Sequence, residues 1–369
     1  MRLVVTGGVV AALAGLIAGV LGLVFPRTAV PATVPYFGMA YGNTLAGMSD
    51  ADLRRALDDA VDLGMSTVRM DLGWNDVQPD GPGSFTWEAT DRVVDAARRR
   101  GLALIMVVAY APRWAQAPGC PYVTCPPADP TAIGPFAREA AQRYADRVLA
   151  WEIWNEPNVA GFWGPQVDPA AYTELLRTAS HAIRTVDPDA TVVLGGLASV
   201  QDTATSVSAP AFLDEVAAAG GLTAVTGIGF HPYTFPLLPR QSAAADGSWA
   251  EIDDLRAVLS RHGFPGLPVW LTEYGAPTGG AGRAYGGRGP VPPGTTHVTE
   301  EQQARIAADA VDLVRADPGI VAMAWYSDRD LDTGSPSDLD NFGLRRTDGT
   351  AKPAYERLRE ALVAGRTAG

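Results

Sequence analysis

The stretch Trp151–Asn158 reads Trp-Glu-Ile-Trp-Asn-Glu-Pro-Asn, and it decides the fold. Its apolar and aromatic residues predict a buried parallel strand that is stopped by Pro157, because proline lacks a backbone donor. The strand therefore ends in the pair Asn155-Glu156. A carboxylate is costly to place at the end of a buried strand, and a glutamate in such a cleft is suited to proton transfer. The stretch predicts a catalytic glutamate at a strand end.

A second stretch, Trp270–Gly275, reads Trp-Leu-Thr-Glu-Tyr-Gly and predicts another apolar strand that ends in Glu273. Retaining glycoside hydrolysis needs two carboxyl groups, one as acid and base and one as nucleophile. Two glutamates at strand ends satisfy this requirement. The pair predicts a glycosidase.

The rest of the chain alternates short apolar runs with amphipathic stretches, which is typical of successive βα units. This alternation predicts a (β/α)8 TIM barrel of the α/β class, with one catalytic domain over residues 33–369. The predicted strands are Tyr36–Tyr41, Ser66–Asp71, Ala103–Tyr110, Val148–Glu156, Thr191–Gly196, Val225–Phe230, Val269–Glu273 and Ile320–Tyr326. The predicted helices are Ser49–Leu63, Trp87–Arg100, Ile133–Ala145, Pro169–Val186, Ala211–Ala219, Trp249–His262, Thr299–Ala316 and Lys352–Val363.

The segments that follow the predicted strands are long, whereas those that lead from a helix to a strand are short. In this fold the loops after the strands lie at the C-terminal face and build the active site. The cleft is therefore expected at that face. Long loops fit either an open groove or a pocket, and aromatic residues spread over several loops favour internal cleavage.

The net charge of −12 argues against binding nucleic acid or anionic lipid through a basic surface. An uncharged oligo- or polysaccharide remains compatible with it. The four histidines lack the spacing of zinc ligands, so we expect neither a metal nor an organic cofactor. We expect the protein to be a monomer.

Residues 1–32 hold a nearly continuous apolar run from Leu3 to Phe25, preceded by Arg2. Such a run is either a signal peptide or an uncleaved membrane anchor. In both cases the remaining chain is expected at the cell surface or outside the cell. The two cysteines, Cys120 and Cys125, are expected to form a disulfide there, with two free thiols as the alternative.

From Tyr36 to Val363 the chain resembles the clan of retaining glycoside hydrolases built on (β/α)8 barrels, which includes cellulases and β-xylosidases. The resemblance rests on Trp-Asn-Glu-Pro at the fourth strand and Thr-Glu-Tyr-Gly at the seventh. It implies that Glu156 is the general acid and base and that Glu273 is the nucleophile.

The resemblance implies further roles in substrate binding. Asn155 would bond the sugar 2-hydroxyl, and Arg69 would lie beside the nucleophile, unless it only forms a structural salt bridge to Asp71 or Glu152. In His231-Pro232-Tyr233, the tyrosine would donate to the nucleophile and the histidine would bind sugar or hold the network. A purely structural histidine is the alternative.

Two tryptophans are candidates for contact with the sugar. Trp325 ends the eighth predicted strand, where the resemblance implies an aromatic platform under the sugar, and Trp114 follows the third. For Trp74, Tyr41, Trp154 and Trp163, core packing and sugar contact stay equally open.

The sequence thus predicts an exported retaining glycosidase that cleaves a β-linked glycan by hydrolysis, or by transfer to a sugar acceptor. A barrel that has lost turnover and only binds cell-wall or capsule polysaccharide is the alternative. Retention of both glutamates, Asn155 and Arg69 counts against that alternative. The acidic stretch Asp328–Asp340 lacks the spacing of a calcium-binding EF-hand, so it is interpreted as a loop near the cleft.

Overall fold

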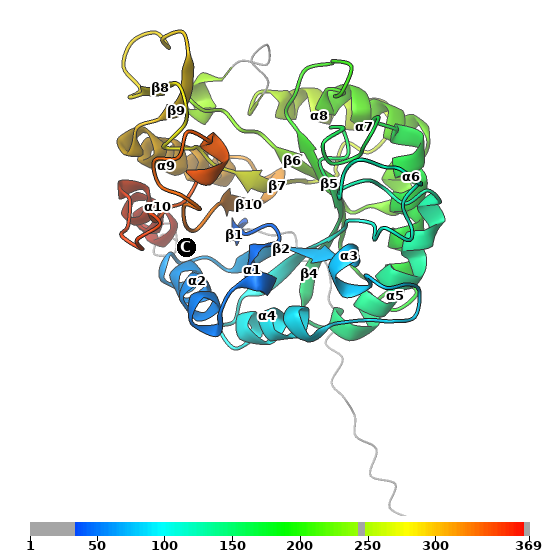
Figure 1. Cartoon of the computed structure of the whole chain (residues 1–369). Coiled ribbons are helices and arrows are strands. Elements are labelled where there is room, and N and C mark those ends of the chain that lie inside the picture. The colour runs from blue at the N-terminus through cyan, green and yellow to red at the C-terminus, as the bar shows by residue number, and fades with distance from the viewer. Residues whose placement is uncertain (1–33, 243–247, 365–369) are drawn as a thin grey trace, which may run out of the picture. The chain divides into compact units, whose positions relative to one another are not determined.

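Eight parallel strands close into a barrel in the computed structural model, which describes residues 34–242 and 248–364. Around the barrel the strands follow the order β1-β10-β7-β6-β5-β4-β3-β2, so each strand pairs with its neighbour in the βα sequence. Figure 1 shows the barrel nearly end-on. The strands are β1 (Tyr36–Ala40), β2 (Thr67–Gly73), β3 (Ala103–Ala109), β4 (Val148–Asn155), β5 (Val192–Ala198), β6 (Gly227–His231), β7 (Val269–Tyr274) and β10 (Ile320–Tyr326).

Helices form an outer ring around these strands (Figure 1). They are α2 (Asp50–Asp62), α4 (Glu88–Arg98), α5 (Ile133–Tyr144), α6 (Pro169–Arg184), α7 (Ala209–Ala218), α8 (Glu251–Arg261), α9 (Glu300–Ala316) and α10 (Pro353–Ala364). Two short helices, α1 (Thr44–Gly47) and α3 (Trp74–Val77), lie in the segments after β1 and β2. A two-stranded sheet of β8 (Arg283–Tyr285) and β9 (Thr295–Val298) lies between β7 and α9.

Local sequence signals set the ends of the helices. At the start of α2, the hydroxyl of Ser49 accepts a hydrogen bond from the backbone N–H of Asp52 at 3.1 Å. Gly64 follows the helix with a φ of 82°, a left-handed conformation that glycine adopts without a steric cost. At α6, the side chain of Asp168 caps the helix and Pro169 occupies its first turn. These signals explain why the predicted helix positions are confirmed.

The apolar core occupies both the barrel interior and the layer between strands and helices. Strand β3 reads Ala-Leu-Ile-Met-Val-Val-Ala, and all of it but the first residue is buried. Such a strand is typical of a parallel sheet that is covered on both faces. Each fully buried Val, Leu or Ile contributes about 1.5–3 kcal/mol through the hydrophobic effect. This core gives the polar side chains of the barrel interior a rigid frame.

The structure confirms the predicted TIM barrel and all eight predicted strands, with ends that shift by one or two residues. It also confirms the disulfide between Cys120 and Cys125. The short helices α1 and α3 and the β8–β9 sheet were not predicted, because they lie inside segments that have no clear periodicity.

The predicted signal peptide or membrane anchor falls on residues 1–32, which lie outside the described residues. Within the described ranges, every helix is too short or too polar to cross a membrane.

Candidate active site

The backbone at the end of β4 positions Glu156, the first predicted catalytic residue. Trp154 and Glu156 have φ values of 72° and 43°, in the left-handed region that non-glycine residues rarely adopt. Each such residue costs about 1–3 kcal/mol, and such strain concentrates at functional sites. The side chain of Asn158 holds the turn, because it bonds Ala198 in both directions, at 2.8 and 2.9 Å. The backbone of Glu156 is therefore fixed at the opening of the barrel.

Below this turn, Glu152 is fully buried and is bonded by four donors. Arg69 donates to it through Nε at 2.8 Å and Nη2 at 3.0 Å. The backbone N–H of Gly196 and the hydroxyl of Thr272 donate at 2.8 and 3.0 Å. A buried carboxylate is stable only when its lone pairs are satisfied in this way. We call Arg69, Glu152, Thr272 and the Gly196 N–H the barrel floor network.

Arg69 connects this network to the second predicted catalytic residue. Its Nη1 pairs with Oε1 of Glu273, and its Nη2 donates to Oδ1 of Asn155 at 2.7 Å. Tyr233 donates to the other oxygen of Glu273 at 3.0 Å. Burial raises the pKa of Glu273, but the charge of Arg69, with His231 and the Tyr233 hydroxyl, outweighs it and lowers the pKa below its ordinary value. Glu273 is thus held as an ionised carboxylate.

Asn155 is oriented by the same arginine. Because Arg69 can only donate, the Asn155 oxygen must face it, and the amide NH₂ faces elsewhere. Asn155 lines the cavity above the strand ends. The NH₂ group is therefore available as a donor to a bound ligand.

His231 joins Glu156 to the barrel floor network. Its Nδ1 lies 2.9 Å from Oε1 of Glu156, and its Nε2 lies 3.0 Å from the hydroxyl of Thr272. Thr272 already donates to Glu152, so it accepts from Nε2–H. One proton then lies between Nδ1 and Oε1 of Glu156, on the carboxyl group when the ring is neutral and on Nδ1 when the ring is charged.

A glycine makes room for this histidine. A Cβ atom on Gly196 would lie 2.0 Å from Nε2 of His231. Any larger residue at this position would displace the ring from Glu156.

The two catalytic candidates and His231 meet at one point. One ligand atom from each of Glu156, His231 and Glu273 lies within 4.8 Å of the others. This trio has the donors for a cation, but Arg69, Tyr233 and His231 already bond the two carboxylates. The expected absence of a metal stays a prediction.

These residues open into a cavity of about 660 Å³ at the carboxyl ends of the strands. Four predicted site residues line it, namely Asn155, Glu156, Tyr233 and Glu273, while Arg69 and His231 support them from below. Its other lining residues are Gly42, Asn43, Asp71, Gly73, Asn75, Asp76, Tyr110, Val123, Thr124, Phe162, Phe235, Tyr326, Asp338, Leu339 and Phe342. The cavity thus joins paired carboxylates to a wall of polar and aromatic groups.

The sequence matches the cellulase family, glycosyl hydrolase family 5, over residues 32–328, which is more than half of the chain. The chain belongs to glycosyl hydrolase family 5. The chain spans just under two thirds of the length of two solved structures that it matches, at 64% and 66%. A comparison with curated proteins finds no significant match.

Solved structures with the same fold come from several families of this clan. A family 39 glycoside hydrolase from Bacteroides cellulosilyticus superposes with a TM-score of 0.69 at 23% identity, over 90% of this chain and 64% of that one. A GH5_18 enzyme from Streptomyces cattleya superposes with a TM-score of 0.67 at 21% identity, over 92% of this chain and 82% of that one. A family 39 β-xylosidase from Caulobacter crescentus superposes with a TM-score of 0.63 at 20% identity, over 89% of this chain and 71% of that one.

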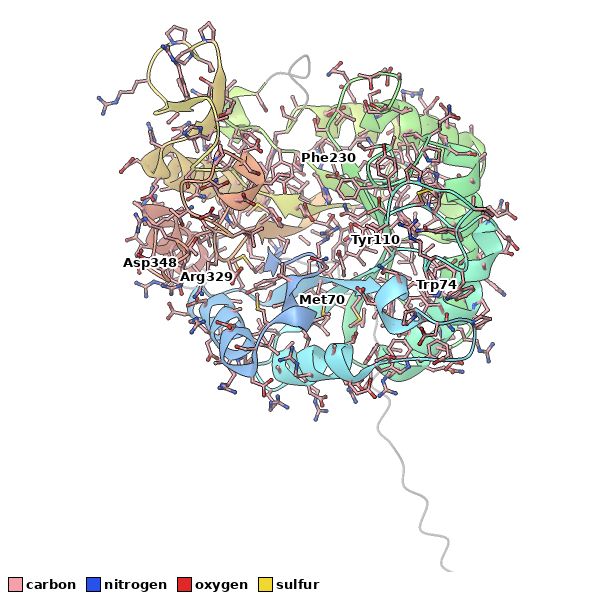
Figure 2. The ribbon with its side chains drawn as sticks, in the orientation of Figure 1. Met70, Trp74, Tyr110, Phe230, Arg329 and Asp348 are labelled. Atoms are coloured by element: carbon pink, nitrogen blue, oxygen red, sulfur yellow. A yellow bond between two sulfur atoms is a disulfide. The ribbon has the colours of Figure 1, made fainter. Side chains whose placement is uncertain are left out.

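Sequence reasoning missed three residues in the cavity wall of this family 5 protein, namely Asp71, Tyr110 and Tyr326. Asp71 lies two residues after Arg69 on β2, so both side chains face the barrel interior. That spacing was the available signal for Asp71. Tyr110 follows the end of β3 and lies nearer the centre of the barrel than Trp74 does (Figure 2). Among the described residues none forms a side-chain hydrogen bond with these three.

Both predicted tryptophans lie outside the cavity lining, and the structure contradicts the prediction for Trp325. Trp325 is fully buried and packs edge-on against Tyr274, with ring centroids 6.0 Å apart, so it cannot offer its face to a sugar. The next residue, Tyr326, lines the cavity instead. Trp114 packs edge-on against Trp74 and donates from Nε1 to the backbone of Gln78 at 2.9 Å, outside the cavity lining. Which residue of a strand end faces the cleft depends on barrel register, which periodicity alone does not fix.

The four aromatic residues left open in the sequence also lie outside the cavity lining. Trp74, Tyr41, Trp154 and Trp163 are all at most 1% exposed. They belong to the core.

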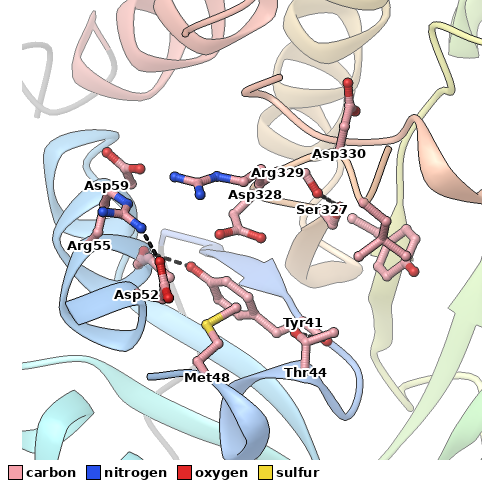
Figure 3. A pocket seen from close by; sticks show the side chains of 13 residues that line it. Tyr41, Thr44, Met48, Asp52, Arg55, Asp59, Ser327, Asp328, Arg329 and Asp330 are labelled. Atoms are coloured by element: carbon pink, nitrogen blue, oxygen red, sulfur yellow. Dashed lines mark hydrogen bonds and ion pairs between the residues drawn. The ribbon is translucent and has the colours of Figure 1, made fainter. Parts of the chain in front are cut away.

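A second, smaller cavity of about 170 Å³ lies beside α2 and the segment after β10 (Figure 3). Its lining includes Tyr41, Arg55, Asp59, Asp328 and Arg329, but neither catalytic glutamate. Burial raises the pKa of Asp328 to about 6. This cavity is separate from the paired carboxylates, although Tyr326 contributes to both linings.

The acidic stretch Asp328–Asp340 is held largely by the protein itself. Asp330 accepts from Lys352 at 2.6 Å and from the backbone of Gly343 at 2.9 Å. Asp340 accepts from Ser335 at 2.7 Å. Two residues of the stretch, Asp338 and Leu339, reach the catalytic cavity, as expected for a loop near the cleft.

Proposed function

We propose that this protein hydrolyses a β-linked oligo- or polysaccharide with retention of anomeric configuration, using Glu273 as nucleophile and Glu156 as general acid and base. The observation that carries the proposal is the distance between the two carboxylates, whose nearer oxygens lie within 4.8 Å. Retaining enzymes hold the two carboxyl groups about 5–5.5 Å apart, whereas inverting enzymes need about 6.5–9.5 Å to admit a water molecule.

In the first step, Glu273 attacks the anomeric carbon while the bond from that carbon to the glycosidic oxygen breaks. Glu156 gives its proton to the departing oxygen, and a covalent glycosyl ester forms on Glu273. The electrostatics fit these roles, because Arg69 and Tyr233 keep Glu273 ionised. The bond to His231 keeps a proton between the imidazole and Glu156.

In the second step, Glu156 removes a proton from water as the water oxygen attacks the anomeric carbon. The ester bond breaks, and Glu273 returns as a carboxylate. The NH₂ group of Asn155 is placed to bond the sugar 2-hydroxyl in both steps, an interaction that strengthens in the transition state. A sugar acceptor in place of water would give transglycosylation.

The proposal includes export, with residues 1–32 as a signal peptide or membrane anchor. The apolar run from Leu3 to Phe25 and the Cys120–Cys125 disulfide support it, because disulfides persist outside the reducing cytosol. Fractionation of cells that make the full chain would test this part. Recovery of the protein in the cytosol would contradict it.

The catalytic proposal is tested by screening residues 33–369 on aryl β-glycosides and polysaccharides, with Glu273→Ala as the control. Products released by the wild type and not by the variant support it and identify the sugar class. Binding of a glycan without any product would favour a barrel that only binds polysaccharide. Equal activity of the variant would exclude Glu273 as nucleophile.

A further inference from the structure

Asp71 lies in the wall of the catalytic cavity, close to the nucleophile. It is two residues after Arg69 on β2, and in the barrel register it pairs with Val107, which in turn pairs with Glu152. Side chains at these paired positions share the inner face of the barrel. Arg69 belongs to the floor, so Asp71, two residues further along β2, is one step nearer the opening than Arg69, and it lines the cavity with Glu273.

The carboxylate of Asp71 has no partner of its own in the part of the chain that the structure describes. Arg69, its nearest cation along the strand, donates to Glu152, Asn155 and Glu273 and forms no ion pair with Asp71. Buried and half-buried carboxylates are ordinarily bonded by the protein. An acceptor left free in a substrate cavity is available to a ligand.

The charged side chains that line the cavity with Asp71 are all acidic. Two further aspartates, Asp76 and Asp338, line the same cavity, together with the two catalytic glutamates. No lysine, arginine or histidine stands among the described residues of the lining. A cavity lined in this way repels anionic groups and attracts cationic or hydrogen-donating ones.

The titration of Asp71 agrees with this geometry. Burial raises its pKa to about 7, Arg69 opposes the shift, and Glu273 and Glu152 add to it. The groups that face it are therefore mostly acidic, and Tyr110 and Tyr326 also interact with its charge. A ligand that donates a hydrogen bond or carries a positive charge would favour the ionised form of Asp71.

We propose that Asp71 is a specificity-determining residue that binds a donor group of the sugar, a hydroxyl or a free ammonium, and that it excludes uronic acids from the catalytic cavity. This inference rests on the proposed glycosidase function, because it assumes that the cavity holds a glycan. It narrows the substrate class to neutral glycans and to glycans with unsubstituted amino sugars.

Three tetrasaccharides with one β-1,4-linked backbone separate these chemistries. Cellotetraose is neutral, the glucosamine tetramer carries an amino group at C2, and the glucuronic acid tetramer carries a carboxylate at C6. Their binding is measured by calorimetry in slightly acidic buffer, in which the amine is protonated, and in slightly alkaline buffer, in which Asp71, with its pKa of about 7, is ionised. The protein carries Glu156→Gln as a common background, so that no probe is consumed.

The test compares Asp71→Asn with the matched control Asp338→Asn in this background. In the alkaline buffer both substitutions remove one negative charge from the cavity lining, but only the first changes Asp71. Thermal unfolding of both variants checks that the fold is kept.

With Asp71 ionised in the alkaline buffer, the acidic tetramer should bind at least about tenfold more weakly than the better of the other two, because the two carboxylates repel each other. Asp71→Asn should reduce this discrimination about tenfold, and Asp338→Asn should change it less than about twofold. If Asp71→Asn weakens the binding of the glucosamine tetramer more than that of cellotetraose, the donor group is an ammonium. If it weakens the binding of both equally, the donor group is a hydroxyl.

The inference is overturned if Asp71→Asn leaves all three affinities unchanged, if Asp338→Asn has the same effect, or if none of the three probes binds. Turnover by the otherwise wild-type enzyme is measured separately on the same probes and on the wider glycan panel. Selective binding without turnover of any glycan would contradict the proposed function while supporting the role of Asp71. Turnover without the predicted selectivity would support the proposed function and contradict the role of Asp71.

Discussion

The barrel floor network and the cavity wall are neighbouring regions of the barrel, but their polar side chains differ in how fully the protein bonds them. In the floor, Arg69 and Glu152 are fully buried and every oxygen of Glu152 is bonded by the protein. In the wall, Asp71, Tyr110 and Tyr326 line the cavity and form no side-chain hydrogen bond among the described residues. The floor fixes geometry, whereas the wall is open to a ligand.

The two catalytic glutamates stand at the boundary between these regions. Both oxygens of Glu273 are bonded, by Arg69 and Tyr233. Among the residues that the structure describes, only His231 bonds the carboxylate of Glu156, through Oε1. A nucleophile must be held in one position, but an acid must keep an oxygen for the departing group. The difference in their support matches the proposed division of roles.

The largest loss of activity is expected when the nucleophile, which stands at this boundary, is removed. Glu273→Ala should lower turnover by at least about 10⁴-fold, because no other group can form the glycosyl ester. Its fold should persist, since Glu273 is partly exposed to the cavity. Azide should restore part of the activity and release a glycosyl azide of inverted configuration, which NMR would identify. Full activity without azide would contradict the assignment.

Glu156→Ala should lower turnover about 10²–10⁴-fold on substrates with poor leaving groups. Aryl glycosides with activated leaving groups need little proton donation, so the first step on them should lose much less. Steady-state and burst kinetics on a series of aryl glycosides would measure this. An equal loss across the series would argue against Glu156 as the acid.

Arg69→Met tests the floor. It leaves Glu152 buried without its main partner, so the free energy of unfolding should fall by about 3–5 kcal/mol. Activity should also fall, because the pKa of Glu273 is no longer held down. Chemical denaturation and kcat measurements on Arg69→Met and Asp71→Asn would compare how much a floor residue and a wall residue contribute to stability and to activity. Equal stability of the two variants would contradict the distinction.

Tyr233→Phe should have the smallest effect. Its hydroxyl helps to lower the pKa of Glu273, and the nucleophile is active only when ionised. Removing the hydroxyl raises that pKa, so activity should be lost at a higher pH as the pH falls. The acid limb of kcat/KM against pH would measure the shift. A limb that stays in place or moves to lower pH would show that the bond does not act on Glu273.

The sequence predicted what depends on periodicity and on strand ends. Glu156 and Glu273 end long apolar runs, so their strands and their common position at the barrel opening could be read directly. Arg69 could be placed beside Glu273 only through the family resemblance. Its contact with Glu152 joins residues far apart in the chain.

The missed residues depend on register and on loop conformation. Trp325 and Tyr326 are neighbours, and only the three-dimensional register decides that the second one reaches the cavity. Gly196 gives no sequence signal for its role, because that role is the space it leaves for His231. Asp71 shares the alternating pattern of Arg69, but its lack of a partner is visible only in the folded protein.

The central claim is that Glu273 and Glu156 act together as a retaining pair, and the anomeric configuration of the first product tests it most directly. Hydrolysis of a β-linked substrate identified by the screen would be followed by proton NMR from the first turnover, before the free sugar equilibrates. The account predicts that the β-anomer appears first and the α-anomer grows in later by mutarotation. Initial release of the α-anomer would show inversion and contradict the proposed roles of both glutamates.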